Sequence, residues 1–171
     1  VFTSSMAVYG RGNPPFGEDE QPSPVDPYGI AKYGCELDYR VAEEQHGLDY
    51  CIIRPHNVYG INQNIWDRYR NVLGIWMYNI MNDGKITVFG DGSQKRDFIH
   101  VADLAKANYL SAIHPEKINT AFNVGLGATL SVLDLAKLID GDNFEFIEKR
   151  DGESDITFAD TAKIREVLGW K

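Results

Sequence analysis

The sequence feature that most constrains the fold is a short apolar strand that follows a long helix. Residues 50–55 read YCIIRP, a run of apolar and β-branched residues without the polar alternation of a half-exposed strand. Such runs are typical of strands that are covered on both faces in a parallel sheet. A helix over residues 26–46 precedes this strand, because Asp26 can cap it and Gly47 can end it. Residues 1–5 also have a strand pattern, so strand, helix and strand are expected to form one parallel crossover unit.

The same alternation continues along the rest of the chain. Further helices are expected within residues 67–82, 96–113, 131–139 and 161–170, and further strands within residues 86–92, 120–125 and 144–148. This order predicts an α/β fold in which parallel strands dominate. Ligands bind such sheets beyond the carboxyl ends of the strands. We therefore expect Ser4, Ser5, residues 54–57 and residues 123–125 to lie together at one edge.

Composition limits the classes of partner. The 171 residues carry a net charge of −8, which opposes broad attraction to nucleic acid or anionic lipid, and no apolar run approaches the roughly 18 residues of a membrane helix. Cys35, Cys51 and the four histidines form neither a disulfide framework nor a metal-ligand spacing. We expect a cytoplasmic protein that binds a small molecule, without metal, nucleic acid or membrane, and with both cysteines buried.

A Tyr-x-x-x-Lys pair lies near the start of the predicted helix over residues 26–46. In the stretch DPYGIAKYGCE, Tyr28 and Lys32 are four residues apart and therefore share one helix face. A lysine ammonium close to a phenol stabilises the phenolate, which can then accept a proton. The spacing alone is equally consistent with one turn of an ordinary amphipathic helix, since it arises by chance in roughly half of chains of this composition.

Six motifs, taken in order, resemble those of the extended short-chain dehydrogenase/reductases. They are SSMAVYG (4–10), YGIAK (28–32), RPHNVYG (54–60), VFGDGSQKRDFIHVADLA (88–105), FNVG (122–125) and REVLGWK (165–171). Within that group the chain is most similar to NAD-dependent nucleotide-sugar epimerases of the UDP-glucose 4-epimerase type. The resemblance implies a doubly wound, Rossmann-like parallel sheet with a smaller α/β substrate-binding domain, and NAD as cofactor.

The resemblance also implies how the chain is organised. Family members begin with a Gly-rich strand, turn and helix that cradle the dinucleotide pyrophosphate, and the sequence contains no such turn. We therefore expect an N-terminally truncated piece. Residues 1–60 and 96–128 are expected to form the C-terminal half of the NAD-binding Rossmann domain, and residues 61–95 and 129–171 the nucleotide-sugar substrate-binding region. This piece alone is expected to be inactive.

The resemblance assigns the chemistry to three residues. Tyr28 is the expected acid/base, Lys32 stabilises its phenolate and holds the nicotinamide ribose, and Ser5 hydrogen-bonds the reacting oxygen. Tyr28, Lys32 and Ser4 are the expected NAD contacts. The alternative for Ser5 is a hydroxyl bonded to nearby backbone at a strand end. Arg54 is expected to be structural.

Eight further positions resemble substrate contacts of this family. The asparagine of RPHNVYG meets the sugar or phosphate, a pair in RNVLG meets the diphosphate, and a pair in ITVFG lies along uracil. The arginine of KRDFIHV binds the diphosphate through its planar fork, and an arginine and an acid in RDGES bind ribose and phosphate. In this order they are Asn57, Asn71, Val72, Thr87, Phe89, Arg96, Arg150 and Glu153. A helix cap or a surface ion pair is the alternative explanation for each polar one.

The reaction that the resemblance implies is epimerisation of a UDP-sugar at its 4-position through a transient 4-keto intermediate. Related sugar 4,6-dehydratases carry carboxylates after the position of Ser5, where this chain has Met6 and Ala7. The chain therefore lacks the general acid and base that elimination of water requires at this position. Other family reactions (dehydration, reduction or decarboxylation) and noncatalytic nucleotide-sugar binding by this piece are the alternatives. Thr157, in place of a bulky tyrosine, indicates room for an N-acetyl group.

The resemblance extends to assembly and to metabolic role. The helix that begins at Tyr28 resembles one that family members use in a dimer interface, so the parent protein is expected to be a homodimer. Such enzymes serve sugar metabolism and polysaccharide biosynthesis.

Overall fold

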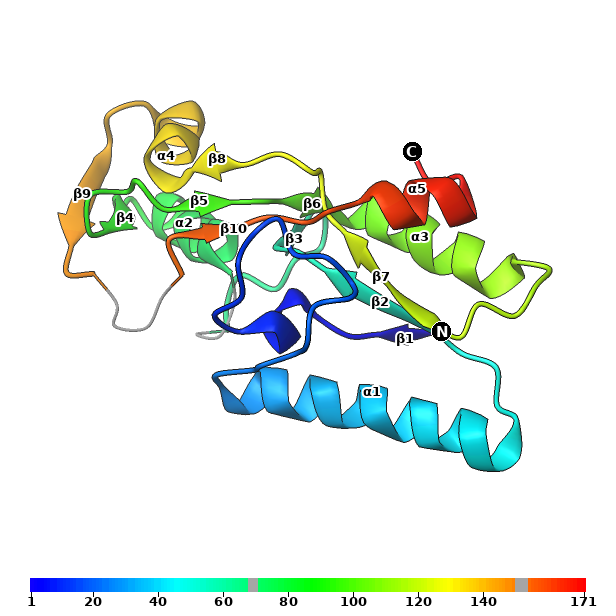
Figure 1. The fold of residues 1–171 in the computed structure, drawn as a ribbon. Helices are drawn as coiled ribbons and strands as arrows, with labels where there is room; N and C mark the ends of the chain where they lie inside the picture. The colour runs from blue at the N-terminus through cyan, green and yellow to red at the C-terminus, as the bar shows by residue number, and fades with distance from the viewer. Residues whose placement is uncertain (68–70, 150–153) are drawn as a thin grey trace.

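The computed structural model describes residues 1–67, 71–149 and 154–171 as an α/β structure (Figure 1). Its strands are β1 (Phe2–Thr3), β2 (Cys51–Pro55), β3 (Val58–Tyr59), β4 (Ile86–Phe89), β5 (Lys95–Arg96), β6 (Ile99–His100), β7 (Thr120–Val124), β8 (Leu130–Ser131), β9 (Phe144–Ile147) and β10 (Ile156–Thr157). Its helices are the 3-10 helix η1 (Met6–Tyr9) and the α-helices α1 (Pro27–His46), α2 (Val72–Met81), α3 (Val101–Ile113), α4 (Val132–Asp140) and α5 (Ala162–Leu168).

The larger part of the structure is organised around a parallel sheet in the order β1-β2-β7. Strands β2 and β7 pair from Cys51 opposite Thr120 to Pro55 opposite Val124, and every residue of β2 is buried. Helix α1 covers one face of this sheet, and α3 and α5 cover the other (Figure 1). The strand covered on both faces and the parallel α/β fold are therefore confirmed.

Helix α1 begins and ends where its sequence predicts. The Asp26 carboxylate accepts a hydrogen bond of 2.7 Å from the Gly29 N–H, and Pro27 occupies the first turn, where a missing N–H removes no helical bond. At the other end Gly47 has a φ of 67°, and its N–H donates to the Glu43 carbonyl. This left-handed conformation favours glycine because a side chain would be strained there.

The main apolar core lies between the parallel sheet and helices α3 and α5. Its buried members are Cys51, Ile53, Ile99, Ala107, Phe122, Val124, Ile164, Leu168 and Trp170. Helix α5 belongs to residues 129–171, which the sequence analysis assigns to the substrate-binding region. It packs on β7 nonetheless, because Ile164 and Leu168 are four residues apart and form one apolar stripe.

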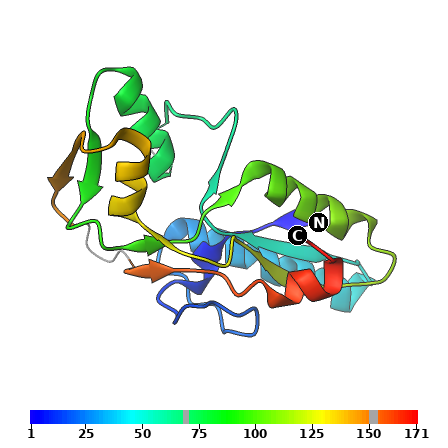
Figure 2. The same ribbon diagram turned by 90° about the horizontal axis from the view of Figure 1, so that it is seen from above.

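A smaller lobe contains the parallel pair of strands β4 and β9 and the helices α2 and α4. Ile86 lies opposite Phe144 in this pair. Trp76 of α2 is fully buried against it, and the indole N–H donates to the Thr87 carbonyl at 2.8 Å. Figure 2 shows the smaller lobe beside the parallel sheet, with β5 and β10 running between the two.

The two cysteines differ in burial. Cys51 is buried in β2 as predicted, whereas the prediction for Cys35 is wrong because this side chain is exposed. Successive helical residues point about 100° apart, so burial of Glu36 against the sheet leaves Cys35 outside. Among the described residues, no helix is long and apolar enough to cross a membrane. Nor do three or more His, Cys, Asp or Glu side chains gather there in a way that could hold a metal ion.

Candidate active site

The carboxyl ends of β1, β2 and β7 meet at one edge of the parallel sheet. Beyond the strand ends, the Ser4 N–H donates to the Ile53 carbonyl at 2.7 Å, and the His56 N–H donates to the Val124 carbonyl at 2.8 Å. These bonds bring Ser4, residues 54–57 and residues 123–125 side by side, as the sequence predicts. The first turn of α1 lies next to this edge (Figure 1). This is the edge where parallel sheets bind ligands.

Tyr28 and Lys32 lie on the side of α1 that faces the end of β1. The Lys32 ammonium is 5.8 Å from the centre of the Tyr28 ring and 5.1 Å from that of Phe2, and it donates to the Thr3 carbonyl at 2.9 Å. Tyr28 itself is 56% exposed. The chain therefore holds the ammonium beside a phenol that remains open to a ligand.

Ser5 caps the 3-10 helix that follows β1. Its Oγ accepts a hydrogen bond of 3.2 Å from the Ala7 N–H, and the residue is 9% exposed. The local backbone bond that the sequence analysis gives as an alternative is thus present. A hydroxyl that accepts from backbone still carries its own proton, so Ser5 can donate to an oxygen at this edge.

A buried polar network lies beneath the edge. The Glu36 carboxylate accepts from Arg54 Nε at 3.0 Å, from Arg54 Nη2 at 2.6 Å and from the Ser4 hydroxyl at 2.6 Å. Arg54 Nη1 donates to the Tyr9 hydroxyl at 2.9 Å, and that hydroxyl donates to Asn123 Oδ1 at 2.7 Å. The side chains of Glu36 and Arg54 are both 0% exposed. One network therefore joins α1 to the ends of β1, β2 and β7.

The charges in this network are balanced inside the protein. Burial opposes the charge of Arg54, but its bonds to Glu36 and Tyr9 more than offset burial and raise the pKa of the guanidinium. Burial raises the pKa of the Tyr9 phenol to about 12, although the neighbouring Arg54 acts in the opposite direction. Tyr9 therefore stays protonated near neutral pH and serves as a donor. Arg54 has the structural surroundings that the sequence analysis expects of it.

His56 is enclosed at the same edge. It is 0% exposed, and neither ring nitrogen has a hydrogen-bond partner among the described residues. Its ring centre lies 6.1 Å from that of Phe16. Burial lowers the pKa of His56 to about 4, because a charged imidazole loses its hydration there. The ring therefore packs as a neutral side chain at pH 7.

Two of the predicted substrate contacts are asparagines with defined structural bonds. Asn57 Nδ2 donates to the Asp97 carbonyl at 2.6 Å. Asn71 caps α2, since its Oδ1 accepts from the Gly74 N–H at 3.1 Å, and its Nδ2 donates to the Val58 carbonyl at 2.6 Å. The capping alternative is thus present for Asn71, whereas the Asn57 side chain is bonded to backbone through its amide nitrogen.

Three other predicted substrate contacts lie in the smaller lobe. Val72 begins α2 and packs partly buried against the core of that lobe. Thr87 and Phe89 lie half-buried in β4, where they pair with β9. Arg150 and Glu153 lie outside the described residues.

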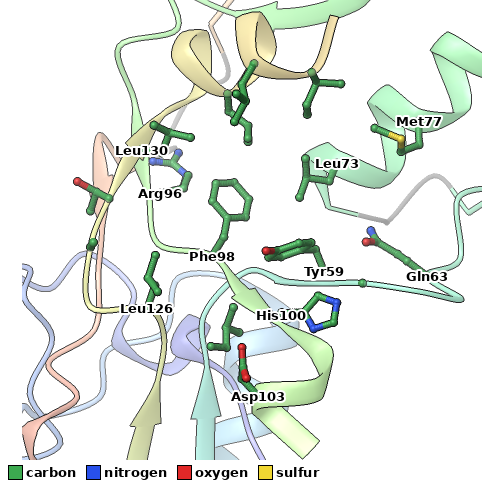
Figure 3. A pocket seen from close by; sticks show the side chains of 17 residues that line it. Tyr59, Gln63, Leu73, Met77, Arg96, Phe98, His100, Asp103, Leu126 and Leu130 are labelled. Carbon is green, nitrogen blue, oxygen red and sulfur yellow. The ribbon is translucent and has the colours of Figure 1, made fainter. Parts of the chain in front are cut away.

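Arg96 is 9% exposed and lines a cavity of about 730 Å³ between the two lobes (Figure 3). Its Nη1 donates to the carbonyls of Lys95 and Asp155 at 2.9 and 3.3 Å. The cavity is mostly apolar, and its larger side chains include Tyr59, Leu73, Met77, Phe98, Leu126 and Leu130. Of the predicted site residues within the described ranges, Arg96 alone lines it. Tyr28, Lys32 and Ser5 lie elsewhere.

Asp97, next to Arg96, joins the parallel sheet to the strands between the lobes. Its carboxylate accepts from the Leu126 N–H at 2.7 Å and from the Gly127 and Ala159 N–H groups at 3.1 Å each. Burial raises the pKa of this carboxyl, while the three N–H groups act to lower it. A Cβ added at Gly125 would lie 2.5 Å from an Asp97 oxygen. This close approach explains the glycine that ends FNVG.

Glu36, Tyr9 and Asp97 are site residues that the sequence motifs do not predict. A signal for Glu36 is present, because an arginine in a strand covered on both faces requires a buried acid. Glu36 also follows Lys32 by four residues and therefore lies on the same helix side. Tyr9 ends the short 3-10 helix η1 and Asp97 lies between β5 and β6, and no spacing in the sequence connects them to their partners.

This edge and this order of strands and helices define a class of protein. A sequence model of the NAD dependent epimerase/dehydratase family matches residues 1–125, and the chain belongs to that family. NAD is the cofactor of the family, and the resemblance to extended short-chain dehydrogenase/reductases is thereby confirmed.

Several relatives of this chain are 4-epimerases of UDP-sugars. The UDP-glucose 4-epimerase of Lactobacillus helveticus is 34% identical over 100% of this chain and 58% of its own length. The solved UDP-N-acetylglucosamine 4-epimerase from Methanobrevibacter ruminantium M1, in complex with UDP-N-acetylmuramic acid, is similar with a TM-score of 0.92 and 34% identity, over 99% of this chain and 56% of that one. The UDP-glucuronic acid 4-epimerase from Bacillus cereus, in complex with UDP-glucuronic acid and NAD, is similar with a TM-score of 0.87 and 27% identity, over 99% and 55%. The chain thus spans little more than half the length of these proteins.

Proposed function

We propose that the full-length protein catalyses NAD-dependent epimerisation of a UDP-sugar at its 4-position through a transient 4-keto sugar. One observation carries the proposal: α1 holds the Lys32 ammonium beside the open phenol of Tyr28, at the sheet edge where Ser5 follows β1. Membership of the epimerase/dehydratase family and the likeness to UDP-sugar 4-epimerases support this reaction over other uses of the same edge.

The polar groups at this edge fit a nicotinamide cofactor. When bound, NAD supplies reversible hydride transfer. We assign to Tyr28 the transfer of the proton of the sugar 4-hydroxyl, to Lys32 the stabilisation of the phenolate, and to Ser5 a hydrogen bond to the reacting oxygen. The ammonium of Lys32 has three donors, and the bond to Thr3 uses one, so it can also hold ribose hydroxyls. Ser4 donates its proton to Glu36, so it can meet the cofactor only as an acceptor.

The substrate would lie across the two lobes. We assign the diphosphate to Arg96, whose planar guanidinium suits phosphate oxygens, together with Asn71 and Val72 at the start of α2. Asn57 would meet the sugar or phosphate through its amide oxygen. Thr87 and Phe89 would lie along uracil. Arg150 and Glu153, the proposed ribose and phosphate contacts, complete the assignment from outside the described residues.

We propose the same division of labour for the lobes. Residues 1–60 and 96–128 would serve NAD binding, and residues 61–95 and 129–171 substrate binding, with α5 contributing to the support of the parallel sheet. The proposed cytoplasmic homodimer would use the outer side of α1, where Ile30, Leu37 and Val41 are exposed.

Epimerisation is favoured over dehydration by the residues after Ser5. Expulsion of water needs a proton donor and a base close to the sugar. Met6 and Ala7 have no ionisable side chain, and the 3-10 helix that they begin packs its Val8 and Tyr9 side chains inward. The first turn after Ser5 therefore offers hydrogen bonding and shape but no carboxylate.

The test is to incubate the full-length protein with catalytic NAD and UDP-glucose or UDP-N-acetylglucosamine, and to resolve the sugars by NMR. We expect the 4-epimer without net NADH, and at least about a 100-fold loss of rate in Tyr28→Phe. Tyr109→Phe, which changes an exposed tyrosine on α3, is the matched control and should retain full activity.

Other products would replace the proposal. A 4-keto-6-deoxy sugar indicates a dehydratase, stoichiometric use of cofactor a reductase, and release of carbon dioxide a decarboxylase. Substrate binding without turnover indicates a noncatalytic binding role. The same assay on the 171 residues alone tests the expectation that this piece is inactive.

A further inference from the structure

Helix α1 is anchored to the rest of the chain at two buried positions. Of its 20 residues, all described, Gly29 and Glu36 are the buried ones. Gly29 lets the first turn approach η1, because an added Cβ would lie 2.6 Å from the Ala7 carbonyl oxygen. Tyr33 and Tyr39 are only partly buried and pack from the sides. Glu36 is therefore the one buried polar anchor of this helix.

The Glu36 carboxylate fixes α1 to two strand ends at once. Both of its oxygens accept from Arg54, which directly precedes Pro55 at the end of β2, and one of them also accepts from the Ser4 hydroxyl just after β1. A bidentate pair of this kind restricts orientation as well as distance. The helix can therefore neither slide along nor roll on the sheet without breaking buried bonds.

Glu36 and the proposed catalytic residues lie on one side of α1. Tyr28, Lys32 and Glu36 follow at steps of four residues, and each step turns the helix by only about 40° from the previous position. Lys32 donates to the carbonyl of Thr3, and Glu36 accepts from the side chain of Ser4, the next residue. Successive turns of the helix thus contact successive residues at the end of β1.

We propose that Glu36 is a positioning residue for the proposed reaction, an inference that rests on the proposed function. By holding α1 in this register, the Glu36 carboxylate keeps the Lys32 ammonium on the Thr3 carbonyl, which fixes the Lys32 side chain beside Tyr28 at the edge where Ser5 follows β1. Glu36 is fully buried and does not itself reach the open edge. Its effect is transmitted through the rotation of the helix and through Ser4, which directly precedes Ser5.

The experiment compares Glu36→Gln with Glu44→Gln in the full-length protein. Both substitutions remove one carboxylate from α1, but Glu44 is exposed, which makes it the matched control. The first readout is kcat and KM for the 4-epimerisation. The second is independent of turnover: 3-fluorotyrosine is placed at position 28, and its fluorine NMR signal gives the pH midpoint at which this phenol ionises.

The direction of the midpoint separates positioning from a simple charge effect. Loss of the Glu36 negative charge would by itself favour the phenolate and lower the midpoint. If α1 shifts, Lys32 loses its bond to the Thr3 carbonyl and its ammonium can move away from Tyr28, which removes the stabilisation of the phenolate and raises the midpoint. We expect a higher midpoint in Glu36→Gln, a fall in kcat of about 10- to 100-fold for a displacement of about 1 Å, and little change in KM. Glu44→Gln should match the wild type.

A folded Glu36→Gln variant with wild-type kcat, or with an unchanged or lower midpoint, would overturn the proposal. If Glu36→Gln does not fold, Ser4→Ala takes its place, because it keeps the pair with Arg54 and removes only the link to β1. A higher midpoint in Ser4→Ala supports the proposal, and a wild-type midpoint overturns it. Absence of epimerase activity in the wild type would instead refute the proposed function, while the fluorine signal would still test the positioning of Tyr28.

Discussion

The polar side chains on two neighbouring parts of helix α1 differ in their exposure to solvent. In the first turns of α1, Tyr28 is 56% exposed, and the described contacts of Lys32 are one carbonyl and two aromatic rings. One turn further on, Glu36 is 0% exposed and both of its oxygens are bonded. The helix groups expected to meet ligands keep unused donors and acceptors, whereas the group that holds the helix accepts three hydrogen bonds inside the protein. Within α1, exposure thus separates the proposed reacting side chain from the supporting one.

This contrast predicts that stability and activity depend on different residues of one helix face. A buried ion pair adds little net stability, because desolvation offsets attraction, but removing one partner leaves an uncompensated charge. An exposed pair contributes only about 0–1 kcal/mol. The four changes below run from the largest expected effect on the free energy of unfolding to the smallest.

Arg54→Leu is expected to have the largest effect. It leaves the Glu36 carboxylate buried without its main partner, which should lower the free energy of unfolding by about 3–5 kcal/mol. The double variant Glu36→Leu with Arg54→Leu removes both charges and should recover most of that loss. Urea denaturation measures both. If the single and double variants were equally unstable, volume rather than the unpaired charge would dominate at this site.

The second prediction concerns His56 and pH. The pKa of His56 is lowered to about 4 in the folded chain, against an ordinary value of about 6.5. Between these values the unfolded chain binds the proton and the folded chain does not, so stability is full above about pH 6.5 and is lost as pH falls towards 4. The loss amounts to about 3 kcal/mol.

The measurement for His56 is the free energy of unfolding of the wild type and of His56→Phe between pH 4 and 7. Burial raises the pKa of the Glu18 and Asp97 carboxyls, and these groups give a slope of opposite sign in both proteins. The difference between the two curves isolates His56. Parallel curves would show that the pKa of His56 is not lowered in the folded protein. The charged imidazole would then be stabilised there by a hydrogen-bond partner or a water molecule.

Local elements could be predicted from the sequence because their determinants are local. Asp26 and Gly47 set the ends of α1, and the unbroken apolar run of β2 reveals a strand covered on both faces. The pair of Tyr9 and Asn123 beneath the edge could not be predicted in this way. Tyr9 and Asn123 are 114 positions apart, and no periodic pattern predicts a contact between a short 3-10 helix and a distant strand end.

In the candidate site, too, some residues could be predicted from the sequence and others could not. The resemblance supplied Tyr28 and Lys32, because a fixed spacing on one helix is a sequence-readable feature. The resemblance did not predict that α5 packs on the parallel sheet. An apolar stripe shows that a helix is covered, but it does not show which element covers it. The arginine of β2 did indicate that an acid must lie nearby, and helix periodicity would have pointed to Glu36.

The third prediction uses two glycines of α1. In Gly29→Ala the new Cβ would lie 2.6 Å from the Ala7 carbonyl oxygen, whereas nothing lies within 4 Å of a Cβ at Gly34. Overpacking should lower the free energy of unfolding of Gly29→Ala by about 1–3 kcal/mol, while Gly34→Ala should raise it by about 0.5–1 kcal/mol because alanine favours helices. Thermal and urea unfolding give both values. Equal effects would mean that α1 can move away from η1 freely.

The smallest effect on stability is expected from Lys32→Met, and it is the sharpest test of the contrast within α1. The substitution keeps the aliphatic stem and removes one partly exposed bond to the Thr3 carbonyl, so the free energy of unfolding should fall by less than about 1 kcal/mol. Epimerisation should fall by at least about 100-fold, because the phenolate of Tyr28 loses its ammonium. Urea denaturation and the NMR assay measure the two quantities on one sample. Arg54→Leu is expected to show the opposite pattern, because its main effect is on the free energy of unfolding. If Lys32→Met instead lost several kcal/mol, the exposed pair would support the fold as Glu36 does, and exposure would no longer separate the two roles.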